Sequence, residues 1–216
     1  MFNVTRGSKA PACLSKKKYN TPEVVKALRS MFHDKCYLCE QDDLAAPEIE
    51  HLDPHEGDED KKYDWNNLFY SCKRCNSIKS NTHKGIVDCC DSKVNVFREI
   101  QCLMPRMLDG DIEVTSTNDS LENTVTLLRK CYNEKKTGLR GITREVLVER
   151  LYDDYADYLQ QRKIIKLKKS TPSQNAEAEA ILKQMLKVSY PFSVFWRWQF
   201  LNDNFLKAKL PDLIDF

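Results

Sequence analysis

The chain has 216 residues, of which 41% are hydrophobic and 31% are charged, as in an ordinary globular protein. Its 34 Lys and Arg residues nearly balance 32 Asp and Glu residues, and this net charge of +2 excludes a uniformly basic protein, so any nucleic-acid contact must be local. No apolar run approaches the ~18 residues that span a bilayer, and residues 1–20 lack the apolar segment of a signal peptide. Together with an odd count of 9 cysteines, this predicts a cytoplasmic protein.

The first predicted element is a helix that follows a basic segment. Residues 1–20 show no apolar periodicity, so we expect a loosely ordered arm that is either simply flexible or lies along a phosphate backbone. Thr21 can cap a helix that has Pro22 in its first position, and this helix leads to Cys36. Its predicted apolar face consists of Val24, Val25, Leu28 and Phe32.

Two Cys-x-x-Cys pairs, Cys36 with Cys39 and Cys72 with Cys75, have the spacing of the ligands of one structural zinc ion. Zn²⁺ prefers four soft ligands in a closed tetrahedron. Disulfides are the alternative, and the absence of a secretory signal favours metal. The 32 residues that separate Cys39 from Cys72 exceed the insert of a plain zinc ribbon, so we expect further structure between the two pairs.

That insert predicts a strand, a loop and a second strand. Residues 47–52 alternate well enough for a short strand that Pro54 ends, and the acidic run 57–62 is predicted to be a solvated loop. Residues 68–71 give the second strand, and residues 76–80 can open a helix directly after the second cysteine pair. A zinc-clamped strand pair followed by a helix is therefore predicted.

The region after residue 81 is predicted to be mainly helical, with one short hairpin. Apolar residues recur every three positions over 94–103, which predicts a short helix that ends at Met104-Pro105. A tight turn at 108–111 precedes an edge strand at 112–114. Asp119 and Glu122 have the spacing of a capping box, and the helix that they open has an apolar face of Leu121, Val125 and Leu128.

Three more helices are predicted towards the end of the chain. Thr143 caps the longest, whose stripe comprises Leu147, Val148, Leu151, Tyr155, Tyr158 and Leu159. A break at 170–175 precedes a helix with Ala180, Ile181, Met185 and Leu186. The last, at 190–201, is aromatic: Phe192, Phe195, Trp196 and Phe200 fit a core face, whereas Trp198 and Leu201 suit either the core, which we favour, or a docking surface.

In the zinc-clamped strand pair and helix, Glu50, His51 and Asn76 are expected to face a common point, as in a metal-dependent phosphodiesterase. The order Cys-x-x-Cys, Glu-His-x-x-Pro, Asn-Leu, Cys-x-x-Cys-Asn-x-x-Lys resembles the zinc-braced HNH endonucleases, which have a ββα-metal core, over about a fifth of the chain. More narrowly, KCYLCE, IEHLDPH, YDWNNLFYSC and CNSIKSN resemble the retron-associated HNH proteins and the PtuB family of nuclease subunits in Septu-type anti-phage systems.

The resemblance implies a role for each matching residue. His51 would be the general base that takes a proton from the attacking water. Glu50 and Asn76 would hold a hard divalent cation, Mg²⁺ or another, and Asn67 would brace the backbone around His51. Phosphate contacts would come from Lys73, Arg74 and Lys79.

The sequence departs from the commonest pattern of that family, because Glu50 stands where aspartate is usual. Its longer side chain makes direct metal contact less secure, and Asp53 or His55 lies close enough in sequence to replace it as a ligand. The basic residues beside the second cysteine pair also have a simpler interpretation, namely an exposed basic face without a ligand.

We therefore predict a mainly helical α+β protein with an N-terminal arm and helix at 1–29, a zinc-braced ββα nuclease core at 30–85 and a helical region with a short hairpin at 86–216. The predicted function is metal-dependent cleavage of DNA or RNA. By resemblance, the chain is the nuclease effector of a defence complex with an ATPase partner resembling PtuA, and a retron reverse transcriptase and its DNA product are further candidate partners. The alternative is a non-catalytic, zinc-scaffolded subunit that binds nucleic acid or protein.

Overall fold

The computed structural model describes residues 1–107, 109–137 and 142–215. Its first part contains helix α1 (Pro22–Met31), strand β1 (Pro47–His51), helix α2 (Glu59–Tyr63), strand β2 (Leu68–Cys72) and helix α3 (Lys73–Lys79). Next come α4 (Val96–Glu99), β3 (Gln101–Leu103), β4 (Glu113–Thr115) and α5 (Glu122–Asn133). The last part consists of α6 (Arg144–Lys166), α7 (Pro172–Met185), α8 (Ser193–Asn202) and α9 (Asn204–Lys209).

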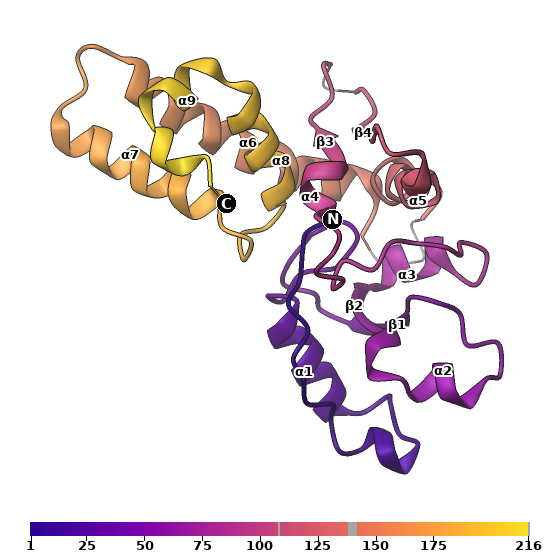
Figure 1. Ribbon diagram of the computed structural model, residues 1–216. Helices are drawn as coiled ribbons and strands as arrows, with labels where there is room; N and C mark the ends of the chain where they lie inside the picture. Colours follow the sequence, from indigo (N-terminus) through magenta and orange to yellow (C-terminus); the bar gives the residue numbers. More distant parts are fainter. Residues whose placement is uncertain (108, 138–141, 216) are drawn as a thin grey trace.

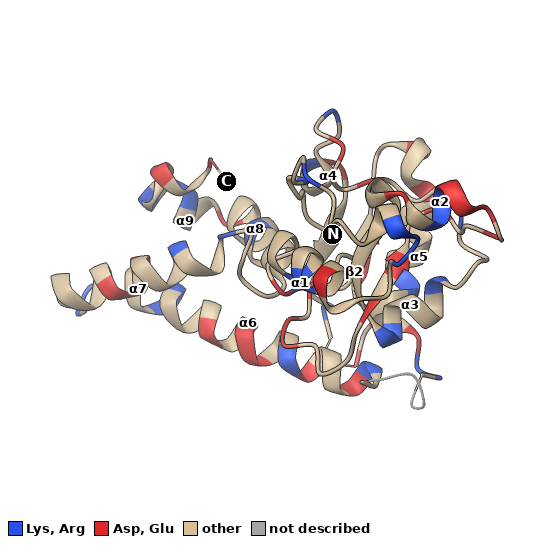
Figure 2. Cartoon of the chain, turned by 90° about the horizontal axis from the view of Figure 1, so that it is seen from below, with Lys and Arg blue, Asp and Glu red and all other residues tan. Residues whose placement is uncertain are grey.

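These three parts follow one another in space as they do in sequence. Figure 1 shows β1, β2 and α1–α3 at one end, α6, α7 and α9 at the other, and α4, α5, β3 and β4 between them. Seen from below, α6 and α7 lie side by side and extend away from the sheet (Figure 2). Among the residues that the structure describes, no helix has the length and apolarity needed to cross a bilayer.

Strands β1 and β2 form the antiparallel pair that the sequence predicts. Glu50 is opposite Phe69 and His51 is opposite Leu68. All five residues of β2 are buried, whereas in β1 only Glu50 is, so β2 lies on the core and β1 on the outer side. Helix α3 begins at Lys73 and not at residue 76 as predicted, because the Cys72 sulfur already accepts a hydrogen bond from the Cys75 amide and caps the helix.

The N-terminal segment is not the loose arm that the sequence predicts. Met1, Phe2 and Val4 are buried. The Val4 amide donates to the Cys89 carbonyl at 2.9 Å, and the Asn3 side chain donates to the Val94 carbonyl at 2.7 Å. The first four residues are thus held against the segment before α4 and belong to the core. Helix α1 is confirmed, with Thr21 as its cap.

A second correction concerns the acidic run 57–62, which contains the start of helix α2 and is not all loop. The Asp58 carboxylate caps this helix by accepting from the amides of Asp60 and Lys61. None of its residues is buried, so the helix has no apolar face that periodicity can detect. Only the capping residue signals it in the sequence.

The two strands in the middle of the chain, β3 and β4, pair as a hairpin, and the first of them lies inside the predicted helix at 94–103. The expected helix at 94–103 is only the four-residue α4, and the chain then turns into β3, which pairs with β4 with Cys102 opposite Val114. Cys102 and Val114 are both buried, so tertiary packing outweighs the helical spacing. The expected turn at 108–111 includes residue 108, which lies outside the described residues. Helix α5 has the predicted apolar face, but Asn118 caps a 3₁₀ turn before it, and the Asp119–Glu122 capping box does not form.

The C-terminal helices form as predicted, but parts of their predicted apolar faces are not buried. Thr143 caps α6 as predicted, although Leu159 of its predicted stripe is 44% exposed. The expected break at 170–175 is the start of α7, because Thr171 and Gln174 form a capping box. The buried face of α7 is Ala178, Leu182 and Met185, so the predicted Ala180 and Ile181 lie outside it.

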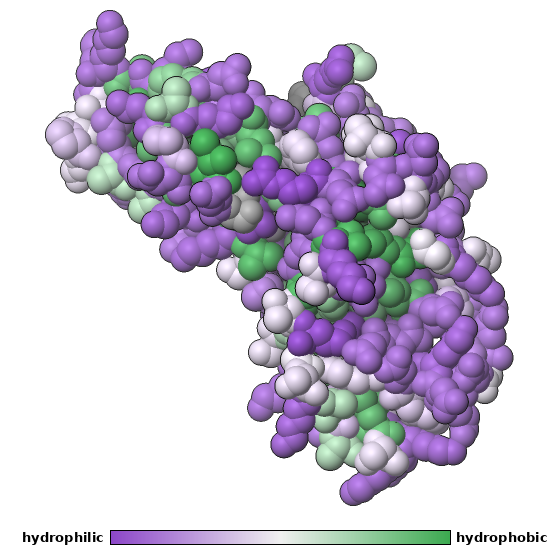
Figure 3. Space-filling view, in the orientation of Figure 1, coloured by the Kyte–Doolittle hydropathy of each residue, from purple (hydrophilic) through white to green (hydrophobic). Residues whose placement is uncertain are grey.

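Helix α8 belongs to the core. Phe192, Phe195, Trp196 and Phe200 are all buried. Trp198 donates to the Ile100 carbonyl at 3.2 Å, which supports the core interpretation and gives this ring an internal use. The face of the molecule shown in Figure 3 is mostly hydrophilic, with hydrophobic patches over the C-terminal helices and the middle of the molecule.

A buried ion pair joins the first cysteine pair to α8. The Lys35 ammonium lies 2.9 Å from the Glu40 carboxylate, and neither side chain is exposed. Lys35 also donates to the Tyr190 carbonyl, and Glu40 accepts from the Ser193 hydroxyl, both at 2.9 Å. The turn that carries Cys36 and Cys39 is therefore fixed to the C-terminal helices.

Candidate functional site

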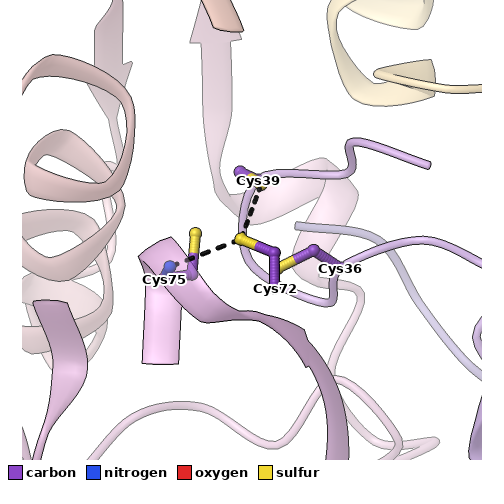
Figure 4. Close-up of side chains that lie close together, drawn as sticks. All are labelled: Cys36, Cys39, Cys72 and Cys75. Atoms are coloured by element: carbon purple, nitrogen blue, oxygen red, sulfur yellow. Dashed lines mark hydrogen bonds between the residues drawn. The ribbon is translucent and has the colours of Figure 1, made fainter. Parts of the chain in front are cut away.

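The four predicted zinc ligands gather at one point. Cys36 and Cys39 lie on the turn before β1, Cys72 ends β2 and Cys75 lies in the first turn of α3 (Figure 4). Their sulfur atoms all lie within 4.8 Å of one another, and all four residues are buried. The Cys39 and Cys72 sulfurs are 3.8 Å apart, which is the separation of about 3.8 Å that tetrahedral Zn–S bonds of about 2.3 Å require.

The chemistry of these thiols also fits a divalent soft metal. Burial opposes ionisation of Cys36, but hydrogen bonds with the other three thiols outweigh it and lower its pKa. Burial raises the pKa of Cys39 and of Cys75. Buried thiols that cannot all ionise alone are stabilised as thiolates by a bound cation, so the set is compatible with a structural zinc ion. All nine cysteines, each within the described part of the chain, are free.

Zinc would join the turn before β1 to the junction of β2 and α3, and β1 and α3 carry the polar residues of the candidate site. Glu48 and Glu50 are two positions apart on β1 and point to one face. Asn76 and Lys79 are three positions apart on α3 and also share a face. Asn76 donates a short hydrogen bond to the Glu48 carboxylate, and Lys79 forms an ion pair of 2.6 Å with Glu50. Two side-chain contacts, Glu48 with Asn76 and Glu50 with Lys79, therefore connect β1 to α3.

The Glu50–Lys79 ion pair is buried. Lys79 is 0% exposed and Glu50 is 5% exposed. Burial raises the pKa of Glu50 to about 7, against the opposing attraction of the Lys79 ammonium. Lys79 also donates to the main-chain carbonyl of His51 at 2.8 Å, so the pair fixes the backbone that carries this histidine.

The His51 ring is held by a main-chain group. Its Nε2 atom lies 3.0 Å from the carbonyl oxygen of Lys62. Because a carbonyl oxygen can only accept, Nε2 must carry the proton, and in the neutral ring the lone pair is then on Nδ1. Burial lowers the pKa of His51, although the hydrogen bond to Lys62 opposes this shift. This lowered pKa favours the neutral ring, in which Nδ1 can accept a proton.

Two other rings contact His51. The Tyr19 and His55 rings have centroids 4.9 Å and 4.8 Å from that of His51, both at steep angles. The His51 side chain is only partly buried, so part of the ring is accessible to solvent. The two ring contacts and the hydrogen bond to the Lys62 carbonyl limit its rotation, as an oriented base would require.

Asn67 holds the loop between the strands. Its carbonyl oxygen accepts from the Asp53 amide at 2.8 Å, and its amide nitrogen donates to the carbonyls of Asp53 and Lys61 at 2.8 and 3.0 Å. Lys61 directly precedes Lys62, whose carbonyl holds His51. Asn67 thus connects the residues that follow β1 to the segment before the Lys62 carbonyl, and its role in bracing the backbone around His51 stays a prediction.

Residues 36–82 match the HNH endonuclease family model. No curated protein and no solved structure gives a significant match to the chain. The matched segment begins at Cys36 and includes the four cysteines, both strands and α3. The chain therefore carries an HNH domain, and the match suggests a nuclease that acts on nucleic acid.

The structure separates the three expected phosphate contacts of the HNH domain. Lys73 is exposed on α3, whereas Arg74 and Lys79 are buried. Arg74 donates to the carbonyls of Cys131 and Glu134 and to the Thr137 hydroxyl, so it joins α3 to the end of α5. Lys79 is held by Glu50. The basic face expected beside the second cysteine pair is therefore reduced to Lys73, because the other two charges have internal partners.

The two substitutes considered for Glu50 have other partners. Asp53 forms an ion pair of 2.6 Å with Lys61, and the Nδ1 atom of His55 accepts from the Gly57 amide at 3.1 Å. Within the described ranges, the sets of three or more His, Cys, Asp or Glu ligand atoms within 4.8 Å of one another are the zinc cysteines and Asp88–Cys89–Cys90. The HNH domain thus has no group of three such ligands around His51 that are already in place.

Three contacts of this site are not predicted from the sequence. They are the bond of Glu48 to Asn76, the contact of the Tyr19 ring with His51 and the bond of the Lys62 carbonyl to His51. Glu48 had a usable signal, because alternation along β1 puts it on the same face as Glu50. The Lys62 carbonyl had none, since a main-chain acceptor is present at every residue and only the course of the loop selects one.

Proposed function

We propose that the HNH domain is a metal-dependent endonuclease that hydrolyses phosphodiester bonds of nucleic acid, with His51 as the general base. The observation that carries this proposal is the hydrogen bond of 3.0 Å between Nε2 of His51 and the Lys62 carbonyl. It leaves the unprotonated Nδ1 to accept a proton from water. Attack by that water in line with the leaving group yields a 5′-phosphate and a 3′-hydroxyl.

The side chains between β1 and α3 fit a hard divalent cation. Asn76 offers an amide oxygen and β1 offers carboxylates, which are the ligand atoms that Mg²⁺ prefers. By resemblance, the carboxylate is Glu50. When bound, the cation polarises the phosphate and stabilises the departing oxygen. The cysteine cluster holds a separate, structural zinc ion that keeps β1 and α3 together.

The surface around α3 supports binding of a phosphate backbone at the same place. Lys73 is exposed one helical turn before Asn76. Arg74 and Lys79 have internal partners, so Lys73 is the exposed cation that α3 offers to a phosphate. Electrostatic contacts of this kind bind DNA and RNA alike.

We further propose that this nuclease is the effector of an anti-phage defence complex of the retron or Septu type. The motifs KCYLCE, IEHLDPH and CNSIKSN support this by their resemblance to PtuB-like subunits. The partner would be an ATPase resembling PtuA, with a retron reverse transcriptase and its DNA product as further components. Expression with the neighbouring gene and copurification test this part separately from the chemistry.

Cleavage assays test the nuclease. Zinc-loaded protein is incubated with single- and double-stranded DNA and RNA, with Mg²⁺ or with EDTA, alone and together with its genomic neighbour. We expect Mg²⁺-dependent cleavage whose products carry 5′-phosphates, and no cleavage by His51→Ala. Cleavage that persists in the His51→Ala variant would contradict the proposed base.

A non-catalytic, zinc-scaffolded binding subunit is the second candidate. The buried ion pair favours this candidate, because Lys79 already occupies the Glu50 carboxylate that the resemblance assigns to the cation. This subunit would bind nucleic acid or protein with equal affinity before and after the His51→Ala substitution and would cleave nothing under any metal condition. Binding titrations run beside the cleavage assay decide between the two.

A further inference from the structure

Glu48 and Glu50 lie on the face of β1 that meets α3, and they differ in what their carboxylates are free to bind. Glu50 is 5% exposed and its partner Lys79 is 0% exposed. Their ion pair measures 2.6 Å. If Glu50 moved to a cation, the Lys79 ammonium would be left buried without its counter-ion, which is strongly unfavourable. A second cation beside Lys79 would add repulsion.

Glu48 has none of these restrictions. It is partly exposed, and its carboxylate contacts the side chain of Asn76 directly. Asn76 is also partly exposed, so a hydrated cation and a phosphate can reach both residues. In the described structure no basic side chain pairs with Glu48, so its charge is not neutralised by the protein.

We propose that Glu48, and not Glu50, is the carboxylate that binds the catalytic divalent cation together with Asn76. This assignment rests on the proposed nuclease function and makes its metal site specific. Glu50 and Lys79 then form a structural pair that holds α3 against β1.

The contact between Glu48 and Asn76 is suited to this role. In the absence of a cation, the Asn76 amide donates its N–H to the carboxylate. Rotation of the amide by half a turn exchanges its nitrogen and oxygen, which have nearly the same shape. The amide oxygen and the carboxylate then lie side by side and attract a cation. One carboxylate and one amide, with water and phosphate oxygens, are a common set of ligands for Mg²⁺.

Binding of Mn²⁺ tests the assignment without relying on turnover. The free Mn²⁺ signal is measured by electron paramagnetic resonance during titration of the zinc-loaded, full-length protein. We expect Glu48→Gln to weaken Mn²⁺ binding by about tenfold or more, with zinc content and Tm unchanged. The matched control is Glu56→Gln, which removes one exposed carboxylate of the same domain, and it should bind as the wild type does.

The corresponding test of Glu50 uses the double variant Glu50→Gln/Lys79→Met, because the single variant leaves a buried ammonium without its counter-ion. We expect this variant to bind Mn²⁺ within about twofold of the wild type, since neither residue is a ligand. Normal binding by Glu48→Gln, or lost binding by a folded double variant, overturns the assignment.

Failure of the nuclease proposal gives a different result. Mn²⁺ binding that depends on Glu48, with no cleavage of any substrate, supports the ligand assignment and contradicts the nuclease. Wild-type protein that binds no Mn²⁺ overturns the ligand assignment itself. The His51→Ala variant should retain Mn²⁺ binding in either case.

Discussion

The Nε2 atom of His51 lies 3.0 Å from the carbonyl oxygen of Lys62, eleven residues later in the chain. This contact crosses the loop between β1 and β2 and determines which ring nitrogen carries the proton. Asn67 in turn holds the segment before that carbonyl through its bond to Lys61. The orientation of the proposed base therefore depends on the loop as much as on the strand that bears it.

Substitution of His51 by alanine is expected to abolish cleavage while leaving the fold intact. The ring is only partly buried, so its loss removes few packing contacts, and general-base catalysis contributes about 10²–10⁴-fold to the rate. Cleavage of a labelled substrate, zinc content and circular dichroism are measured on the same preparation. The control is His33→Asn, a histidine outside the HNH domain, which should cleave as the wild type does. A loss of zinc in His51→Ala would indicate a structural role instead.

Removal of one zinc ligand by Cys72→Ser is expected to lose both the metal and much of the stability. The four sulfurs share one buried site, and structural zinc contributes directly to the free energy of folding. We expect bound zinc to fall from about one ion per chain to nearly none, with a large decrease in Tm. Cys13→Ser removes a half-buried thiol outside the cluster and serves as the control. A Cys72→Ser protein with unchanged zinc and Tm would exclude the four-thiolate site.

Asn67→Asp tests whether the loop orients the base. Aspartate retains the oxygen that accepts from the Asp53 amide but cannot donate to the carbonyls of Asp53 and Lys61. At about 1 kcal/mol for each lost bond, plus the cost of burying a charge, we expect the free energy of unfolding to fall by about 2–4 kcal/mol. Cleavage should decrease at temperatures where the protein is still folded, because the Lys62 carbonyl is no longer held. A variant that is less stable yet fully active below its Tm would limit Asn67 to a structural role.

The C-terminal helices offer a prediction on pH. Burial raises the pKa of Asp154 in α6 to about 6, while the hydroxyl of Tyr190 donates to its carboxylate and partly opposes the shift. The buried carboxyl is tolerated in its neutral form and disfavoured in its charged form. The stability that Asp154 contributes is therefore fully present below the pKa of an unfolded aspartate, about 4, and is lost as the pH rises through the folded-state pKa of about 6. Asp154→Asn removes that loss, so its Tm should exceed that of the wild type at pH 7.5 and equal it near pH 4.

After allowance for solvent around this half-buried group, the gain at pH 7.5 is expected to be about 1 kcal/mol. Thermal unfolding at several pH values measures it. A Tm gain of Asp154→Asn that is the same at pH 4 and pH 7.5 would show that the charge is not its cause.

The parts of the fold that could be predicted are those whose signals are local. Thr21 before Pro22 determines the start of α1, and Thr143 determines the start of α6, because a capping side chain bonds to amides within three residues. The alternation in β1 and the apolar run in β2 likewise reflect neighbouring residues. The clustering of the four cysteines could be predicted because each Cys-x-x-Cys pair is a short-range pattern typical of metal ligands, and one ion would join the two pairs.

Errors arose where distant residues decide the structure. Residues 1–4 look like a free end in the sequence, yet Val4 bonds to Cys89 and becomes part of the core. Residues 101–103 continue a helical spacing, yet they pair with β4 because Cys102 and Val114 are buried together. In both cases the energy of burial against a remote segment exceeds the small local preference.

The candidate site shows the same division. The sequence by itself determined which residues are candidates for the chemistry: four cysteines with the spacing of ligands for one soft ion, a histidine of a type that accepts protons near neutral pH, and oxygen-bearing side chains suited to a hard ion. Only the tertiary structure decided which partner each side chain has. In the structure Lys79 pairs with Glu50, and Asn76 bonds to Glu48. Strand pairing and the packing of α3 against β1 set these distances, and no pattern along the chain predicts them.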